Sequence, residues 1–101
     1  MKVIDEGHSY ELDCVGDQNL CRESQKLDFM KRVNGKMVMD GTTNEDVLKM
    51  LIDRMQYLQR RLPCRENAQV ITKLEEALLW LNSRTQKRME QGVETKDLPH
   101  K

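Results

Sequence analysis

The sequence predicts an α+β fold: a small N-terminal antiparallel β-sheet followed by a long antiparallel α-helical hairpin, assembled as a homo-oligomer. Two patterns predict this order. Asn34-Gly35 lies between two runs of alternating apolar residues, which is typical of a type I′ β-hairpin because both turn residues tolerate positive φ. After residue 42, apolar residues recur at spacings of three and four, on both sides of Pro63. This spacing places them on one face of each of two α-helices.

Length and composition favour self-association. The 101 residues suggest a single domain, 1–101, with a β-rich part at 1–40, a helical hairpin at 42–91 and a tail at 92–101. Only 38% of the residues are hydrophobic and only 4% are aromatic. A chain this small and polar is poorly suited to a compact enzyme with a deep cleft. Its composition is more typical of helices that complete their hydrophobic core by packing against another copy of the chain.

The strand signals lie in two stretches. Residues 8–15 contain the alternating Tyr10 and Leu12, which predict a short strand, and a third strand would accompany the hairpin at 26–40. In that hairpin, one face would carry Leu27, Phe29 and Val33, and the other face would carry Met30 and Arg32.

The first helix has clear signals at both ends. Thr42 followed by Glu45, or Thr43 followed by Asp46, forms a start that resembles a capping box. Pro63 ends the helix because a proline inside it would remove a hydrogen bond. Its apolar face would consist of Val47, Leu48, Leu51, Ile52, Met55 and Leu58.

The second helix is expected to begin near Asn67, a good N-cap residue, to run to about Met89 and to end at Gly92. Its apolar stripe would be Val70, Leu74, Ala77 and Leu81, and the same spacing continues into Arg84 and Arg88. Leu79 and Trp80 lie off this stripe. On a monomer they would be exposed, which is the main reason to expect an obligate homo-oligomer.

Charge, cysteines and hydropathy exclude several classes of protein. With 17 basic and 17 acidic side chains the net charge is zero, so no general attraction to nucleic acid or to a membrane is expected. No apolar run approaches the roughly 20 residues of a membrane span. No signal peptide is visible, and three cysteines then predict free thiols in a reducing cytosol. His8, Cys14 and Cys21 match no common zinc-site spacing, so neither a metal nor another cofactor is expected.

The arginines at the end of the stripe suggest a ligand site shared between chains. Tyr57 and Asn67 would lie near the turn of the hairpin, whereas Arg84 and Arg88 would lie at its other end. Asn67 and Arg84 are 17 residues apart, which is about 25 Å along a helix. In an antiparallel dimer of hairpins, the turn of one chain could meet the arginines of the other.

Such a set of side chains suits a nucleotide, because an aromatic ring stacks on a base, an amide binds base edges and arginine pairs with phosphate. Arg32 could add positive charge from the strands. Alternatively, the terminal arginines only complement the helix dipole. The chain would then be an oligomeric interaction module without a nucleotide. The sequence shows neither a nucleophile paired with a base nor a cluster of metal ligands, so nothing in it suggests an enzyme.

The chain also resembles a known family. The strings "KVIDEGHSYEL", "LDFMKR", "GTTNEDVLKMLIDRMQYL", "PCRENAQVITKLEEALLWL" and "SRTQKRMEQGVET" together resemble phage anti-defence proteins with a shared helical-hairpin domain. These are the Thoeris anti-defence proteins of the first type and the related anti-CBASS sponges. The resemblance implies a non-enzymatic protein in the cytoplasm of the infected bacterium, which sequesters intact cyclic nucleotide immune signals. The signals would be glycocyclic ADP-ribose or cyclic di- or trinucleotides.

The resemblance also implies a dimer or hexamer with ligand sites between protomers, and it suggests roles for individual residues. Tyr57 would stack on the base, and Asn67 and Arg84 would contact the ligand. Arg32 would match an arginine at the end of the family's "F.KR" strand. Arg88 and Gly92 would belong to a second site, for cyclic trinucleotides.

Overall fold

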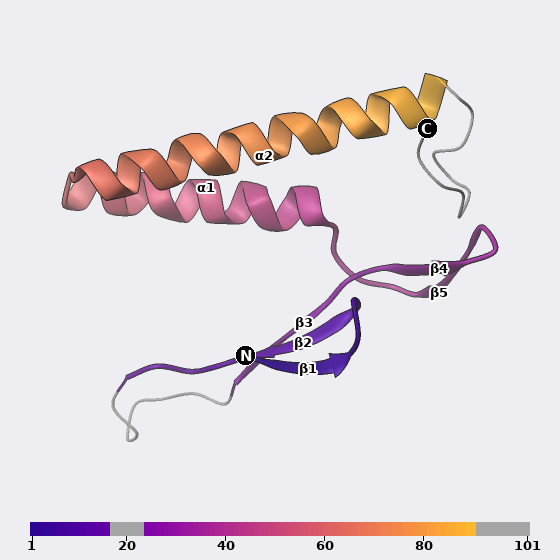
Figure 1. Ribbon diagram of the computed structural model, residues 1–101. Helices are drawn as coiled ribbons and strands as arrows, with labels where there is room; N and C mark the ends of the chain where they lie inside the picture. Colours follow the sequence, from indigo (N-terminus) through magenta and orange to yellow (C-terminus); the bar gives the residue numbers. More distant parts are fainter. Residues whose placement is uncertain (17–23, 91–101) are drawn as a thin grey trace. The chain divides into compact units, whose positions relative to one another are not determined.

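The computed structural model describes residues 1–16 and 24–90. The chain divides into two compact units, one ending at Thr42 and the other beginning at Thr43. Among the described residues, the strands lie in the first unit and the helices lie in the second (Figure 1). The predicted order, small antiparallel sheets followed by a helical hairpin, is therefore confirmed.

The N-terminal unit begins with a three-stranded antiparallel sheet in the order β1-β2-β3. Its strands are β1 (Lys2–Asp5), β2 (Ser9–Leu12) and β3 (Gln25–Asp28). In the middle strand, Tyr10 pairs with Val3 on one side and with Leu27 on the other. Strand β1 was not predicted because its two apolar residues are adjacent, so they give no alternation.

A separate hairpin follows, formed by β4 (Lys31–Val33) and β5 (Lys36–Met39). Its turn residues Asn34 and Gly35 have φ values of 53° and 79°, which confirms the turn predicted at this dipeptide. The strand expected to run from Leu27 to Val33 is, however, interrupted after Asp28.

The interruption occurs where a second segment crosses the chain. Thr42 donates its backbone N–H to the carbonyl oxygen of Asp28 (2.9 Å), and Met30 donates to the carbonyl oxygen of Thr42 (3.0 Å). A Cβ atom on Gly41 would lie 2.5 Å from the carbonyl oxygen of Asp28. Only glycine allows the two backbones to approach so closely.

Little of the N-terminal unit is buried. Ser9, at 7% exposed, is the one buried residue among those that the structure describes. The rings of Tyr10 and Phe29 meet edge to face, with centroids 5.9 Å apart. Lys31 on β4 forms an ion pair of 3.5 Å with Asp5 on β1. Backbone hydrogen bonds between the strands therefore contribute more to the stability of this unit than buried side chains do.

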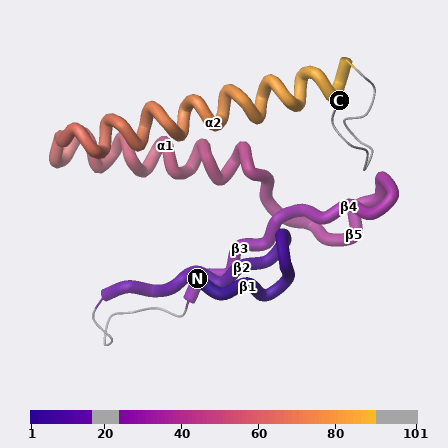
Figure 2. The backbone as a smooth tube through the Cα atoms, in the orientation of Figure 1, coloured from indigo at the N-terminus to yellow at the C-terminus, as the bar shows by residue number. Residues whose placement is uncertain are grey.

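In the second unit, α1 (Asn44–Arg61) and α2 (Arg65–Glu90) pack against each other as an antiparallel pair (Figure 2). The N-cap of α1 is Thr43, whose hydroxyl accepts the N–H of Asp46 at 3.2 Å. This confirms the second of the two predicted starts.

The predicted start of the second helix was wrong. Asn67 lies inside α2, which begins two residues earlier. Cys64 occupies the capping position: its carbonyl oxygen accepts the N–H of Ala68 (3.3 Å), and its sulfur accepts the N–H of Asn67 (3.4 Å). Arg65 and Glu66 are good helix formers, so the helix begins directly after the short connection. Gly92, the predicted end, lies outside the described residues.

The interface between the helices follows a spacing of three and four residues and includes most of the predicted apolar residues. The half-buried ones among them are Leu74, Ala77 and Leu81 on α2 and Val47, Leu48, Ile52, Met55 and Leu58 on α1. On α2 the half-buried residues with this spacing are Asn67, Ile71, Leu74, Leu78, Leu81, Thr85 and Arg88. On α1 they are Leu48, Ile52, Met55 and Gln59. We call these two rows the seam. Val70, which the sequence placed on the stripe, is 42% exposed, and Arg84 is also exposed.

The cysteines differ in state. Cys14 is disulfide-bonded, which contradicts the prediction of free thiols for this residue. Cys64 is free and exposed, and Cys21 lies outside the described residues. An odd number of cysteines requires one unpaired thiol within a monomer, but it does not exclude a pair.

None of the described helices is long and apolar enough to cross a membrane.

Candidate functional site

The turn end of the hairpin presents an aromatic ring and a cation together. Tyr57 lies one turn before the end of α1 and is 46% exposed. Arg61 donates from its guanidinium to the Tyr57 hydroxyl oxygen at 3.2 Å. The guanidinium carbon lies over the Tyr57 ring, 5.6 Å from its centroid. A spacing of four residues brings these two side chains together on the helix surface.

The connection to α2 holds the second predicted residue near the same end. Gln59 accepts the backbone N–H of Cys64 at 3.0 Å, which ties the connection to the last turn of α1. Asn67 follows in the first turn of α2 and is half-buried on the seam. Tyr57 and Asn67 therefore lie at the same end of the hairpin, as predicted.

This end is locally basic although the chain is neutral. Arg60, Arg61 and Arg65 flank the connection, with Glu66 as the nearest acidic residue in the sequence. None of the ion pairs among the described residues involves these three arginines. The turn end therefore carries a local excess of positive charge.

Arg84 and Arg88 lie far from this end. They occupy the last two turns of α2, a single continuous helix of 26 residues. The rise of an α-helix therefore separates Asn67 from Arg84 by about 25 Å. Arg84 is exposed, whereas Arg88 continues the half-buried seam. Within one protomer these arginines cannot meet a small ligand held at Tyr57.

The remaining predicted residues lie elsewhere. Arg32 is half-buried on β4, in the N-terminal unit, where it pairs with Met37 of β5. Gly92 falls outside the described residues. Arg61 was not among the predicted residues, although its spacing of four residues from Tyr57 is visible in the sequence.

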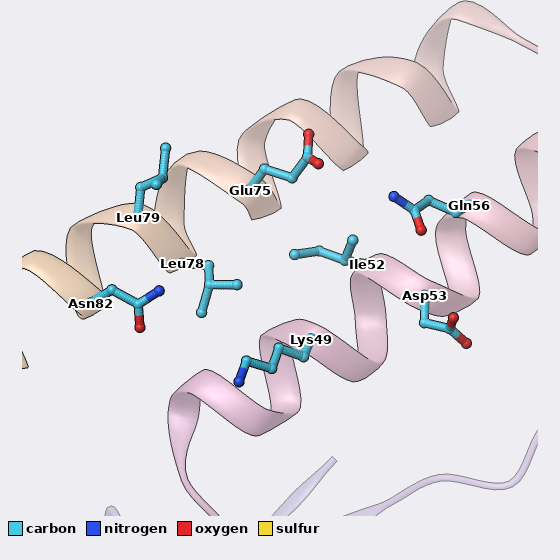
Figure 3. Close-up of a pocket in the computed structure, with 8 residues that line it drawn as sticks. All are labelled: Lys49, Ile52, Asp53, Gln56, Glu75, Leu78, Leu79 and Asn82. Carbon is cyan, nitrogen blue, oxygen red and sulfur yellow. The ribbon is translucent and has the colours of Figure 1, made fainter.

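Midway along the hairpin, an open groove of about 640 Å³ lies between α1 and α2 (Figure 3). It is lined by Lys49, Ile52, Asp53, Gln56, Glu75, Leu78, Leu79 and Asn82. None of the predicted ligand-binding residues lines it. Two carboxylates against one ammonium leave a negative charge, which opposes the binding of a nucleotide. We therefore place the candidate site at the turn end, not in the groove.

The groove nevertheless adjoins exposed apolar surface. Leu79 is 68% exposed and Trp80 is 73% exposed, as the sequence predicted for a monomer. In the part of the chain that the structure describes, no group of three or more potential metal ligands occurs. Exposed apolar side chains of this size are typical of surfaces that contact other proteins.

Comparisons with known proteins point to the helical hairpin. Residues 29–86 match a sequence family described as "Acb2/Tad1, hairpin domain". A protein named "Thoeris anti-defense 1", from Bacillus phage SBSphiJ7, is 57% identical over 56 residues. That alignment covers 54% of this chain and 39% of the relative. The match therefore spans less than half of the length of the relative.

Proposed function

The chain belongs to the Acb2/Tad1 hairpin-domain family, and from this premise we propose that it is a phage Thoeris anti-defence protein. It binds cyclic nucleotide immune signals in the cytoplasm of the infected bacterium and sequesters them without turnover. The candidate ligands are glycocyclic ADP-ribose and cyclic di- or trinucleotides. The effector that the signal would activate then stays inactive.

The observation that carries this proposal is the match of residues 29–86 to the family. This stretch contains Arg32, Tyr57, Asn67 and Arg84. The geometry of the turn end supports it, because the Tyr57 ring is 46% exposed and lies within cation–π distance of an arginine side chain. A base and a phosphate are the two chemical groups that such a surface attracts.

The separation within one helix implies that the site is completed by a second protomer. In this arrangement, Tyr57 stacks on the base and Asn67 binds its edge at the turn of one hairpin. Arg84 reaches the phosphates from the neighbouring hairpin, and Arg32 adds positive charge. Arg88 and Gly92 would contribute to a second site, for cyclic trinucleotides. Self-association is therefore part of the proposal.

The test is isothermal titration of the purified protein against glycocyclic ADP-ribose and cyclic di- and trinucleotides in parallel. Each compound is then recovered by heat denaturation and identified by chromatography. Tight binding with recovery of the intact compound supports the proposal. Absence of heat with every compound contradicts it, and recovery of a cleaved compound contradicts the non-enzymatic mechanism.

A second experiment separates ligand binding from assembly. Arg84→Ala should abolish nucleotide binding, because a phosphate loses its charged partner, while light scattering shows an unchanged oligomer. Dissociation by Arg84→Ala, in a protein that binds no nucleotide, would favour the alternative of an interaction module. Two exposed apolar residues, Leu79 in the groove and Trp80 next to it in the sequence, are the observation that supports this alternative.

A further inference from the structure

Arg61 lies at the turn end, and the proposed function assigns it no contact with the ligand. It makes two contacts with Tyr57: a hydrogen bond of 3.2 Å to the hydroxyl oxygen and a cation–π contact of 5.6 Å to the ring centroid. Both side chains are exposed. Among the described residues Arg61 forms no ion pair with a carboxylate, so no acidic side chain competes with the ring for the guanidinium.

The two contacts restrain different motions of the ring. The hydrogen bond anchors the hydroxyl end of Tyr57 toward the last turn of α1. The cation–π contact places the guanidinium on one face of the ring. An exposed tyrosine without such contacts would move among several rotamers, and binding would then have to immobilise it at an entropic cost.

We propose that Arg61 is a positioning residue of the nucleotide site, which holds the Tyr57 ring ready and leaves its opposite face for a planar base. This inference rests on the proposed function, because it takes Tyr57 to be the residue that stacks on the base. Since the Tyr57 hydroxyl is engaged by Arg61, recognition at this position depends on the face of the ring.

The neighbouring Arg60 provides a matched control. It is also exposed, carries the same charge and lies in the same last turn of α1. No hydrogen bond or cation–π contact joins it to Tyr57 in the structure. If nucleotide affinity depends only on positive charge near the turn, replacing either arginine should raise Kd equally. If it depends on positioning of the Tyr57 ring, only replacement of Arg61 should raise Kd.

The experiment compares Arg61→Met and Arg60→Met in titrations with glycocyclic ADP-ribose, or with whichever cyclic nucleotide binds the wild type. Methionine keeps an unbranched apolar stem and a good helix propensity. Loss of one exposed hydrogen bond and one exposed cation–π contact should raise Kd about three- to tenfold for Arg61→Met. The rise for Arg60→Met should be less than about twofold.

A double-variant cycle shows whether Arg61 acts through Tyr57. Tyr57→Phe removes the hydroxyl and keeps the ring. If Arg61 acts partly through that hydroxyl, the increase in Kd caused by Arg61→Met should be smaller in the Tyr57→Phe background. Circular dichroism should show unchanged helix in each variant. If Arg61→Met reduces the helix content, Arg61→Lys is used in its place. Its rise in Kd should be smaller than for Arg61→Met, because lysine keeps the charge and loses only the planar guanidinium.

Equal effects of Arg61→Met and Arg60→Met in a wild type that binds nucleotide would overturn this inference alone. Equal effects of Arg61→Met in the Tyr and Phe backgrounds would overturn the part assigned to the hydroxyl. A wild type that binds none of the nucleotides would refute the proposed function itself, and this inference with it.

Discussion

The two units of the chain are stabilised by different kinds of contact. The helical hairpin depends on apolar side chains along its seam, although no residue of either helix is fully buried. The N-terminal unit depends on backbone pairing between short strands and on one close crossing at Gly41. The hairpin can therefore tolerate many substitutions outside its seam, whereas the strand unit depends on a few backbone positions.

The largest expected effect comes from placing a charge in the seam. Leu78→Asp removes a half-buried apolar side chain opposite α1 and places a carboxylate there. Lost burial and desolvation of the charge together should cost about 3 kcal/mol of unfolding free energy. Hydrogen exchange should then rise throughout α1 and α2, while β2 and β3 keep their protection.

The matched control is the adjacent Leu79→Asp, the same substitution at a residue that is 68% exposed. In an isolated hairpin it should leave exchange in both helices nearly unchanged. Equal unfolding by the two variants would contradict the contrast between seam and exterior. This conclusion applies where light scattering shows that the Leu79→Asp variant keeps its oligomeric state, because dissociation would instead show that another copy covers Leu79.

A smaller effect, confined to the other unit, is expected from Gly41→Ala. The added Cβ would lie 2.5 Å from the carbonyl oxygen of Asp28, so the backbones at the crossing must move apart. Such overpacking typically costs about 1–3 kcal/mol. Hydrogen exchange should rise at Met30 and Thr42, whose N–H groups bond across this crossing. Unchanged exchange there, or a rise in the helices instead, would show that the crossing does not hold the strand unit together.

The elements that the sequence predicted well are those with a local signal. Asn34-Gly35 needs positive φ at both positions, and Thr43 lies three residues before the N–H that it caps. Strand β1 and the break after Asp28 were missed because they depend on pairing with distant segments. Spacing alone could not distinguish the predicted stripe from the seam, because both follow intervals of three and four residues.

The candidate site was predictable only in part. Tyr57 and Asn67 could be placed at the turn because Pro63 marks where the first helix must end. Arg61 was missed because an arginine in the last turn already has a simpler explanation in the helix dipole. Whether Arg84 meets Tyr57 depends on a second protomer, and the geometry of an interface between chains leaves no periodic signal in one sequence.

The smallest effect tests whether the local signals also contribute measurably to stability. Thr43→Ala removes the hydroxyl that accepts the N–H of Asp46, and loss of such a cap typically costs about 1 kcal/mol. Thr43→Ser keeps the acceptor oxygen and is the control, with no expected loss, because serine is at least as good an N-cap residue as threonine. Denaturant unfolding followed by helical circular dichroism measures both. Because Thr43 begins the helical unit, exchange in α1 should rise near its start while the turn at Asn34 keeps its protection. A loss for Thr43→Ser as large as for Thr43→Ala would mean that the methyl group, not the hydrogen bond, stabilises this end of the hairpin.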